Sequence, residues 1–244
     1  MRVIIPCGGD GQRWGNYTGV PKQLAFIEEE ILLVRTIKQC RQYTDDIWII
    51  TQDQQIEELA NKLNVNVTAG IQEHVNAIDK VLCSTNLWTK HYTIILFGDT
   101  YFTDEALTKI FQINKHDPIF YGRFKNSEFT GKKGWEIYGM KFGIHNQFKF
   151  LSHCQYVKWA AHAGYIKEKT VCIKMALISM DCHRYITSDP TELRNLCTID
   201  DWTEDFDEPE GLILWLQGRK KYGLGQGLKT KLEVREKERD KFRL

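Results

Sequence analysis

Two short segments near the start of the sequence carry residue types that bind a polyphosphate. Residues 6–15 form a glycine-rich turn containing Arg13, and the turn directly follows a β-branched apolar run at residues 3–5. Glycines let backbone N–H groups crowd around an anion, because no side chain stands in the way. Lys22, in the sequence Pro-Lys-Gln, adds a second permanent cation. The residues expected to contact the phosphates are Pro6, Cys7, Gly8, Gly9, Gly11, Arg13 and Lys22.

The spacing of this turn excludes two well-known phosphate loops. A Walker loop requires Gly-Lys-Ser/Thr after four intervening residues, and the segment contains no such sequence. The dinucleotide fingerprint requires glycine where this chain has Trp14. What remains is a strand, then Gly-x-Gly-x-Arg, then a short loop and Pro-Lys.

Acidic residues that could hold a hard cation occur in two places. Asp99 follows a buried strand-like run at residues 93–97, and it lies too far before the helix expected at residues 104–113 to cap it. A second acidic group occupies residues 199–212. Mg²⁺ is normally carried by one or two carboxylates, water and the phosphates of the substrate. The sequence therefore predicts a divalent cation beside the phosphate-binding turn.

The glycine-rich turn and the Pro-Lys pair together resemble the signature of the nucleotidyltransferases that make activated sugars and alcohols. The Pro-Lys-Gln variant at residues 21–23 is most similar to the cytidylyltransferase branch. The resemblance implies a GT-A-type fold, Arg13 and Lys22 as catalytic cations, and Mg²⁺ or Mn²⁺ as cofactor. It implies transfer of a nucleoside monophosphate, with CTP favoured, to a phosphorylated small-molecule acceptor, with release of pyrophosphate. The resemblance also implies a homodimer.

The same resemblance assigns further residues. The segment at 205–212 is similar to the family's closing motif, in which an aspartate joins the first metal ligand; Asp207 matches that position and Asp205 the aspartate before it. The chain departs from the motif at Glu208 and Gly211. Two residues, Gly70 and Asn76, occupy the place where relatives contact the nucleobase. The resemblance does not extend to residues 119–197, and the candidates there for neutralising the acceptor phosphate are simply basic residues: Arg123, Lys141, Lys174 and Lys158.

Alternating strand and helix patterns predict a single α/β domain with a mostly parallel sheet. The resemblance implies the three-layer α/β/α form of this fold, with a mixed sheet, of the nucleotide-diphospho-sugar transferase type. Strands are expected at residues 3–5, 47–50, 65–67, 93–97, 119–123, 135–142 and 171–180. Helices are expected at residues 31–40, 54–63, 74–87, 104–113 and 147–164. Residues 1–118 and 198–216 would bind nucleotide and metal, 119–197 the acceptor, and 217–244 would form a basic tail.

Composition narrows the class of protein. A formal net charge of +1 over 244 residues argues against a general nucleic-acid or membrane binder. Seven scattered cysteines suggest neither a zinc framework nor a disulfide scaffold. The sequence shows no signal peptide and no apolar stretch of about 20 residues. These features predict a reduced, cytoplasmic protein.

Two other functions stay open. A GT-A glycosyltransferase shares the sheet and the acidic metal motif, but it uses a finished nucleotide sugar and needs no Gly-x-Gly-x-Arg or Pro-Lys. A non-catalytic nucleotide-binding module of the same fold would bind a triphosphate without turnover. The basic tail offers a weaker third idea, contact with a subunit or an acidic partner, although mixed-charge terminal helices are usually solvated surface.

Overall fold

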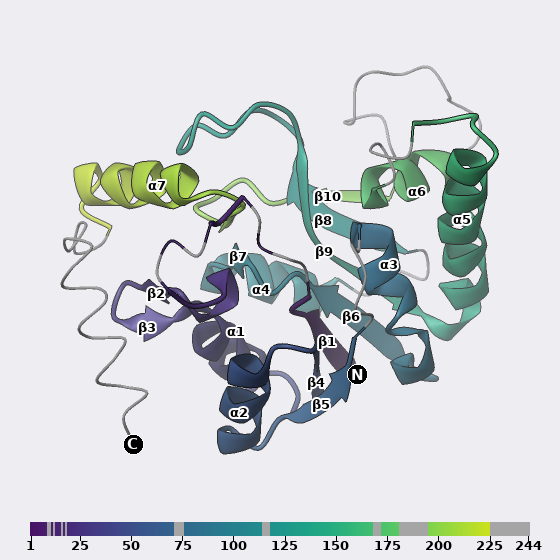
Figure 1. Ribbon diagram of the computed structural model, residues 1–244, viewed down its shortest axis with the longest axis horizontal. Helices are drawn as coiled ribbons and strands as arrows, with labels where there is room; N and C mark the ends of the chain where they lie inside the picture. The colour runs from purple at the N-terminus through teal and green to yellow at the C-terminus, as the bar shows by residue number, and fades with distance from the viewer. Residues whose placement is uncertain are drawn as a thin grey trace.

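A twisted central sheet organises the computed structural model of the chain (Figure 1). The structure describes residues 1–8, 11, 13–15, 17, 19–70, 76–113, 118–167, 172–180 and 195–224. Within these ranges the sheet has seven strands, in the order β10 (Leu196–Thr198), β8 (Ile119–Arg123), β9 (Glu136–Gly143), β6 (Tyr92–Leu96), β1 (Arg2–Pro6), β4 (Ile47–Thr51) and β5 (Asn66–Ala69).

Most neighbouring strands run parallel. β1 pairs in parallel with β4 and β6, β4 with β5, and β10 with β8, whereas β9 is antiparallel to β6 and β8. Because β8 and β6 both run against β9, the carboxyl ends of β1, β6 and β8 lie at one edge of the sheet. Ligands of open α/β sheets bind beyond this edge.

Helices cover both faces of the sheet. They are α1 (Leu32–Cys40), α2 (Gln54–Lys62), α3 (Ala77–Leu82), α4 (Asp104–Gln112), α5 (Ile144–His162), α6 (Ile173–Met180) and α7 (Pro209–Lys221). Two short 3₁₀ turns, Lys22–Leu24 and Thr85–Leu87, and two small antiparallel pairs complete the fold: β2 (Phe26–Ile27) with β3 (Glu30–Ile31), and β7 (Thr100–Tyr101) with β11 (Glu204–Asp205).

Side-chain caps set where several helices begin. The Asp53 carboxylate accepts from two backbone N–H groups at the start of α2, and the Thr103 hydroxyl accepts from Ala106 N in α4. Such caps satisfy N–H groups that have no partner within the helix. Because Thr103 caps α4, Asp99 is not used as its cap, as the sequence predicts.

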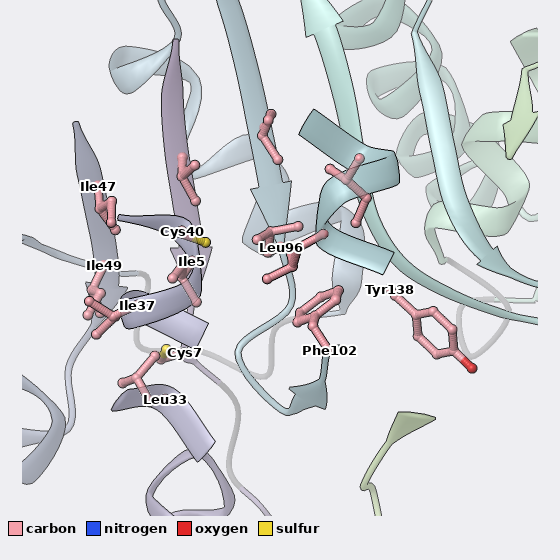
Figure 2. Close-up of a cluster of buried hydrophobic side chains, with 14 of the residues drawn as sticks. Ile5, Cys7, Leu33, Ile37, Cys40, Ile47, Ile49, Leu96, Phe102 and Tyr138 are labelled. Atoms are coloured by element: carbon pink, nitrogen blue, oxygen red, sulfur yellow. The ribbon is translucent and has the colours of Figure 1, made fainter. Parts of the chain in front are cut away.

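Alternation along the strands divides the core between the two faces. In β1, Val3 and Ile5 belong to a cluster with residues of α1, α2 and α4, whereas Ile4 packs in a cluster with α3, α5 and α6. Figure 2 shows the first cluster, where side chains of α1 and neighbouring strands, among them Ile37 and Ile49, interdigitate. This two-sided burial gives the three-layer α/β/α fold that the sequence predicts.

The prediction of a strand at residues 171–180 is wrong, because residues 173–180 form helix α6. Ile173, Ala176, Leu177 and Met180 are buried against the second cluster. A short apolar run that is buried on most sides has no clear period, and it cannot be told from a buried strand by pattern alone. The small pairs β2–β3 and β7–β11 were also not expected.

None of the helices that the structure describes is long and apolar enough to cross a membrane.

Two glycines differ in how much space surrounds them. A Cβ on Gly122, at the irregularity between β8 and β9, would lie 2.0 Å from the Glu136 carbonyl oxygen, whereas a Cβ on Gly211 in α7 meets nothing within 4 Å. We expect Gly122→Ala to lower the free energy of unfolding by about 3 kcal/mol, because two backbones must separate. The control Gly211→Ala should raise it by about 0.5–1 kcal/mol through helix propensity. Urea denaturation of both variants measures the difference, and equal midpoints would contradict it.

Candidate active site

A two-residue strand pair brings the acidic segments together. Asp205 in β11 pairs with Thr100 in β7, and the backbone N–H of Phe206 donates to the Asp99 carbonyl at 3.1 Å. Asp99, at the turn after β6, therefore lies beside Asp205 and Asp207, although about a hundred residues separate them in sequence. The backbone, rather than any side-chain contact, fixes this proximity.

Three cations surround the acidic residues. The Lys22 ammonium pairs with Asp99 and also lies 3.4 Å from Asp207 Oδ1. The Arg13 guanidinium reaches the same Asp207 oxygen at 3.0 Å. Lys132 Nζ lies 2.8 Å from Asp205 Oδ2 and 3.2 Å from Asp207 Oδ2. Asp207 is thus the centre of the cluster, and all three cations contact it.

In this cluster, burial and neighbouring charges shift the pKa values of the carboxylates and of Lys22 in opposite directions. Burial raises the pKa of Asp99, but the charges of Lys22 and Lys80 and the hydrogen bond from Lys22 lower it to about 2. Burial likewise opposes ionisation of Asp207, and Lys22 and Lys132 still hold its pKa below the ordinary value. The pKa of Lys22 is raised, because Asp99 and Asp207 outweigh its own burial. At neutral pH these three groups are charged.

Asp205 differs from its neighbours. Burial raises its pKa, and the Lys132 ammonium only partly opposes this effect. Its Oδ1 atom is buried and accepts no hydrogen bond from the residues that the structure describes, whereas Oδ2 accepts from Lys132.

The three aspartates, Arg13 and Lys22 line a pocket of about 630 Å³ beyond the carboxyl ends of the strands. The glycine turn and the Lys22 segment form one part of it, and the first residues of α3 and α6 form another. The predicted site residues on its wall are Gly8, Gly11, Arg13, Lys22, Asn76, Asp99, Lys174, Asp205 and Asp207.

Other predicted nucleotide contacts lie off the pocket wall. Pro6 and Cys7 pack beneath the turn at Gly98, where an added Cβ would lie 2.6 Å from the Cys7 sulfur. Gly70 directly follows β5, and its carbonyl accepts a hydrogen bond from Gln52. Gly9 lies outside the described residues. Asn76 lines the pocket, but its side-chain oxygen accepts from Asp79 N and caps α3.

Two of the predicted acceptor contacts, Arg123 and Lys141, do not line the pocket. Arg123 is buried, and its guanidinium bonds Glu204, Tyr138 and backbone carbonyls, so it joins the β8–β9 hairpin to β11. Lys141 is also buried, and its ammonium donates to the carbonyls of Ile110 and Phe111 at the end of α4. Both side chains point away from the pocket because structural partners inside the protein occupy them.

Three charged pocket or cluster residues, Lys80, Lys132 and Glu136, were missed. Lys80 lies one helical turn after Asn76, and this spacing could have found it. Glu136 begins β9 and forms ion pairs with Lys132 and Lys174 at 3.4 and 3.3 Å. Lys132 lies on the polar hairpin 124–135, and no sequence feature distinguishes it from other lysines of that hairpin.

An aromatic cluster lies behind the charges. It consists of Trp14, Ala25, Ile27, Leu32, Tyr101, Phe206, Leu212 and Trp215. Trp14 follows Arg13 directly, and Phe206 separates Asp205 from Asp207. The segments that carry the site charges are therefore each anchored by a neighbouring buried side chain.

A clasp around Arg219 joins α7 to the turn after β2. The guanidinium bonds both carboxylate oxygens of Glu28, at 2.7 and 3.1 Å, and its carbon lies 4.8 Å from the Trp215 ring centre. The Tyr101 hydroxyl donates to the same carboxylate at 2.9 Å. Because α7 begins just after Asp207 and β2 just after Lys22–Leu24, the clasp holds the two sides of the Lys22–Asp207 pair in register.

The residues present fit a divalent cation that arrives with its substrate. Asp99 and Asp207 both face a single cationic atom, Lys22 Nζ, so their carboxylates converge on one point. Within the described residues, no group of three or more His, Cys, Asp or Glu could hold a metal by itself. Two carboxylates completed by water and substrate phosphates are the usual donor set for Mg²⁺.

The fold is that of the nucleotidyltransferases. A CTP:phosphocholine cytidylyltransferase from Streptococcus pneumoniae matches with a TM-score of 0.57 at 14% identity, over 91% of this chain and 96% of that one. An inositol-1-phosphate CTP transferase from T. maritima gives 0.55 at 13%, over 98% and 96%. A protein assigned as a glucose-1-phosphate thymidylyltransferase, from Bacillus anthracis, gives 0.58 at 13%, over 96% and 99%.

The sequence agrees with this fold. The family model of the MobA-like NTP transferase domain matches residues 3–163, about two thirds of the chain, and the chain belongs to this family. A search of curated proteins gives no match. The resemblance seen in the glycine turn and the Pro-Lys pair is thereby confirmed.

Loss of the Arg219 clasp should weaken the attachment of α7. We expect Arg219→Met to lower the free energy of unfolding by about 3 kcal/mol, because it leaves the Glu28 carboxylate, 17% exposed, without its ionic partner. The neighbouring Lys220 is exposed, so Lys220→Met serves as the matched control and should change it by less than about 0.5 kcal/mol. Urea unfolding measures both; equal losses would show that the clasp does not stabilise the fold.

The depressed pKa of Asp99 predicts a stability loss in acid. A carboxyl with a pKa of about 2 in the fold and about 3.9 when unfolded stabilises the fold above pH 4, and this contribution disappears as the pH falls toward 2. In Lys22→Met the pKa of Asp99 should rise, because burial then dominates. Carboxyl ¹³C NMR titration of the metal-free protein measures this; an unchanged Asp99 pKa in the variant would contradict the assignment to Lys22.

Proposed function

We propose that the chain transfers CMP from CTP to a phosphorylated small-molecule acceptor and releases pyrophosphate, with Mg²⁺ as cofactor. The observation that carries the proposal is the charge arrangement of one pocket. Arg13 and Lys22 lie at its glycine-rich end, and the convergent carboxylates of Asp99 and Asp207 lie beside them. A triphosphate needs cations and N–H groups, and its metal needs carboxylates; the pocket offers both.

Two further cations on the pocket wall suit the acceptor phosphate. Lys80 comes from α3 and Lys174 from the start of α6, on the face of the sheet covered by α3, α5 and α6. Lys174 is held by Glu136, whose carboxylate lies 3.3 Å from its ammonium. A dianionic phosphate would be attracted to these two lysines while the donor occupies the glycine-rich end. Because Arg123 and Lys141 bond to groups inside the protein, Lys80 and Lys174 are the cations proposed to bind the acceptor phosphate.

The reaction follows from this placement. An oxygen of the acceptor phosphate attacks the α-phosphorus in line, the bond from that phosphorus to the bridging oxygen breaks, and pyrophosphate leaves. Mg²⁺ held by Asp99 and Asp207 would neutralise charge that develops on the phosphates. The attacking phosphate is already an anion, so no general base is required. Arg13 and Lys22 hold the triphosphate, and positioning with charge neutralisation supplies the rate, as in other phosphoryl transfers.

The preference for cytosine rests on two kinds of support. Pro21-Lys22-Gln23 is similar to the cytidylyltransferase signature. Two of the structures that share the fold act on CTP by name, whereas a third is assigned to thymidylyl transfer. The proposed compartment is the cytoplasm, where nucleoside triphosphates are made, and no disulfide joins the cysteines in the described ranges.

Thermal unfolding with CTP, UTP, GTP or ATP, each with and without Mg²⁺, tests the donor site. A nucleotide at a hundred times its dissociation constant should stabilise the fold by about 2.7 kcal/mol, and we expect this with CTP and Mg²⁺. Arg13→Met should remove most of the shift without unfolding the protein, because the Arg13 side chain is 65% exposed. Lys38→Met, at a side chain 63% exposed on α1, is the matched control and should keep the shift.

Turnover separates the alternatives. Pyrophosphate release with phosphorylated alcohols and sugars should fall about 10²- to 10³-fold in Lys22→Met, as for other groups that stabilise a transition-state charge. A shift with a nucleotide sugar and with no triphosphate would instead identify a glycosyltransferase. Triphosphate binding without pyrophosphate release on any acceptor would identify a non-catalytic module.

A further inference from the structure

Helix α5 has an aromatic face that nothing in the described part of the chain covers. Its buried side, Phe150, Cys154, Val157 and Ala160, packs toward the sheet, α3 and α6, and Figure 1 shows α5 at the outer edge of the molecule. Its other side carries the exposed apolar residues, which are Ile144, Phe148, Tyr156 and Trp159, followed by Tyr165 just beyond the helix.

Three of the exposed rings, those of Tyr156, Trp159 and Tyr165, lie close together, and Phe148 lies further toward the start of the helix. Phe148 is 79% exposed, Trp159 55% and Tyr165 74%. The Trp159 ring centre lies 5.9 Å from that of Tyr156 and 5.5 Å from that of Tyr165. Single exposed apolar residues are ordinary on a protein surface, but a row of aromatic rings along one helix indicates a binding surface.

Lysines border this row on both sides. At about 100° per residue, Ile144, Phe148 and Trp159 fall within an arc of about 60°, Lys158 lies about 40° to one side and Lys149 about 80° to the other. Both lysines are exposed, and Lys158 also pairs with Asp79 of α3 at 2.6 Å.

The segment as a whole is basic. Residues 144–167 contain three lysines and three histidines but no aspartate or glutamate, in a chain that has 32 acidic residues. The net charge of +1 for the whole chain does not reveal this local excess of positive charge. The expectation of no membrane contact was drawn from the net charge, so it does not apply to this surface.

We propose that the outer face of α5 binds an anionic lipid surface. Aromatic side chains at the centre with lysines at the borders are the pattern of a helix that lies flat in the bilayer interface, where Trp and Tyr are favoured and lysines attract acidic headgroups. A second copy of this chain fits less well, because a two-fold interface through this face would oppose two basic segments. A single convex helix also presents no groove for an acidic protein segment, whereas a bilayer can accommodate a convex helix.

Vesicle co-sedimentation of the full chain tests the proposal. We expect binding to vesicles of equal parts phosphatidylglycerol and phosphatidylcholine, little binding to phosphatidylcholine alone, and release at about 1 M salt, where screening acts within ~3 Å. Lys149→Glu should lower the partition coefficient about fivefold or more, since one lysine near an anionic surface contributes about 1 kcal/mol. The control Lys62→Glu, at an exposed lysine of α2, should leave it unchanged.

A second pair of variants tests the aromatic face. Phe148→Ser with Trp159→Ser should abolish binding, whereas Leu214→Ser, at a residue of α7 that is 46% exposed, should not. The urea midpoint of each variant shows that the fold is kept. Equal binding to both vesicle types, or to neither, overturns the proposal. Without vesicle binding, self-association lost in the Phe148/Trp159 variant would assign the face to a second copy, and retention on polyglutamate lost in Lys149→Glu would assign it to an acidic protein.

Discussion

The mutual neutralisation of buried charges around Asp207 is the constraint on which the site depends. Asp99 and Asp207 stay ionised in a poorly solvated place only because Lys22 and two further cations lie within contact distance. Such a cluster is stable only if its members are held in place, since a small displacement leaves a charge unpaired. The aromatic cluster behind the site supplies this rigidity through Trp14 and Phe206, which adjoin the charged residues in sequence.

The two halves of the pocket are joined through one short strand. In β11 the side chain of Glu204 is fully buried among Arg123, Ser127 and Tyr138 of the hairpin side, while the next residue, Asp205, faces Lys132 and the pocket. Alternation along a strand thus sends successive side chains to the structural partner and to the ligand-binding space. The hairpin that carries Lys132 is attached by the same strand that presents the acidic residues.

The sequence predicted what depends on local pattern. The buried strands, the turn with Arg13 and the place of Asp99 at a strand end follow from periodicity, glycine content and the geometry of parallel sheets. What it could not predict depends on distant contacts: Lys132 meets Asp207 across 75 residues, and Arg123 is enclosed by Glu204 across 81. The sequence alone does not distinguish a basic side chain that faces a pocket from one that pairs with a buried carboxylate. Helix α6 was missed because a uniformly apolar run lacks a period.

Lys22 lies between the carboxylates of Asp99 and Asp207, and this position affects how a substrate would enter the site. This lysine has two carboxylate partners, so under the proposed function a triphosphate and its metal would not enter an empty, strongly charged cavity. They would exchange ions with it: Asp99 and Asp207 would hold the metal, and the Lys22 ammonium would pair with the phosphates. In such an exchange the number of charge contacts changes little, so attraction alone discriminates poorly among polyanions. Selectivity would then depend on geometry, because only a ligand that places both metal and phosphate among these groups would complete the exchange.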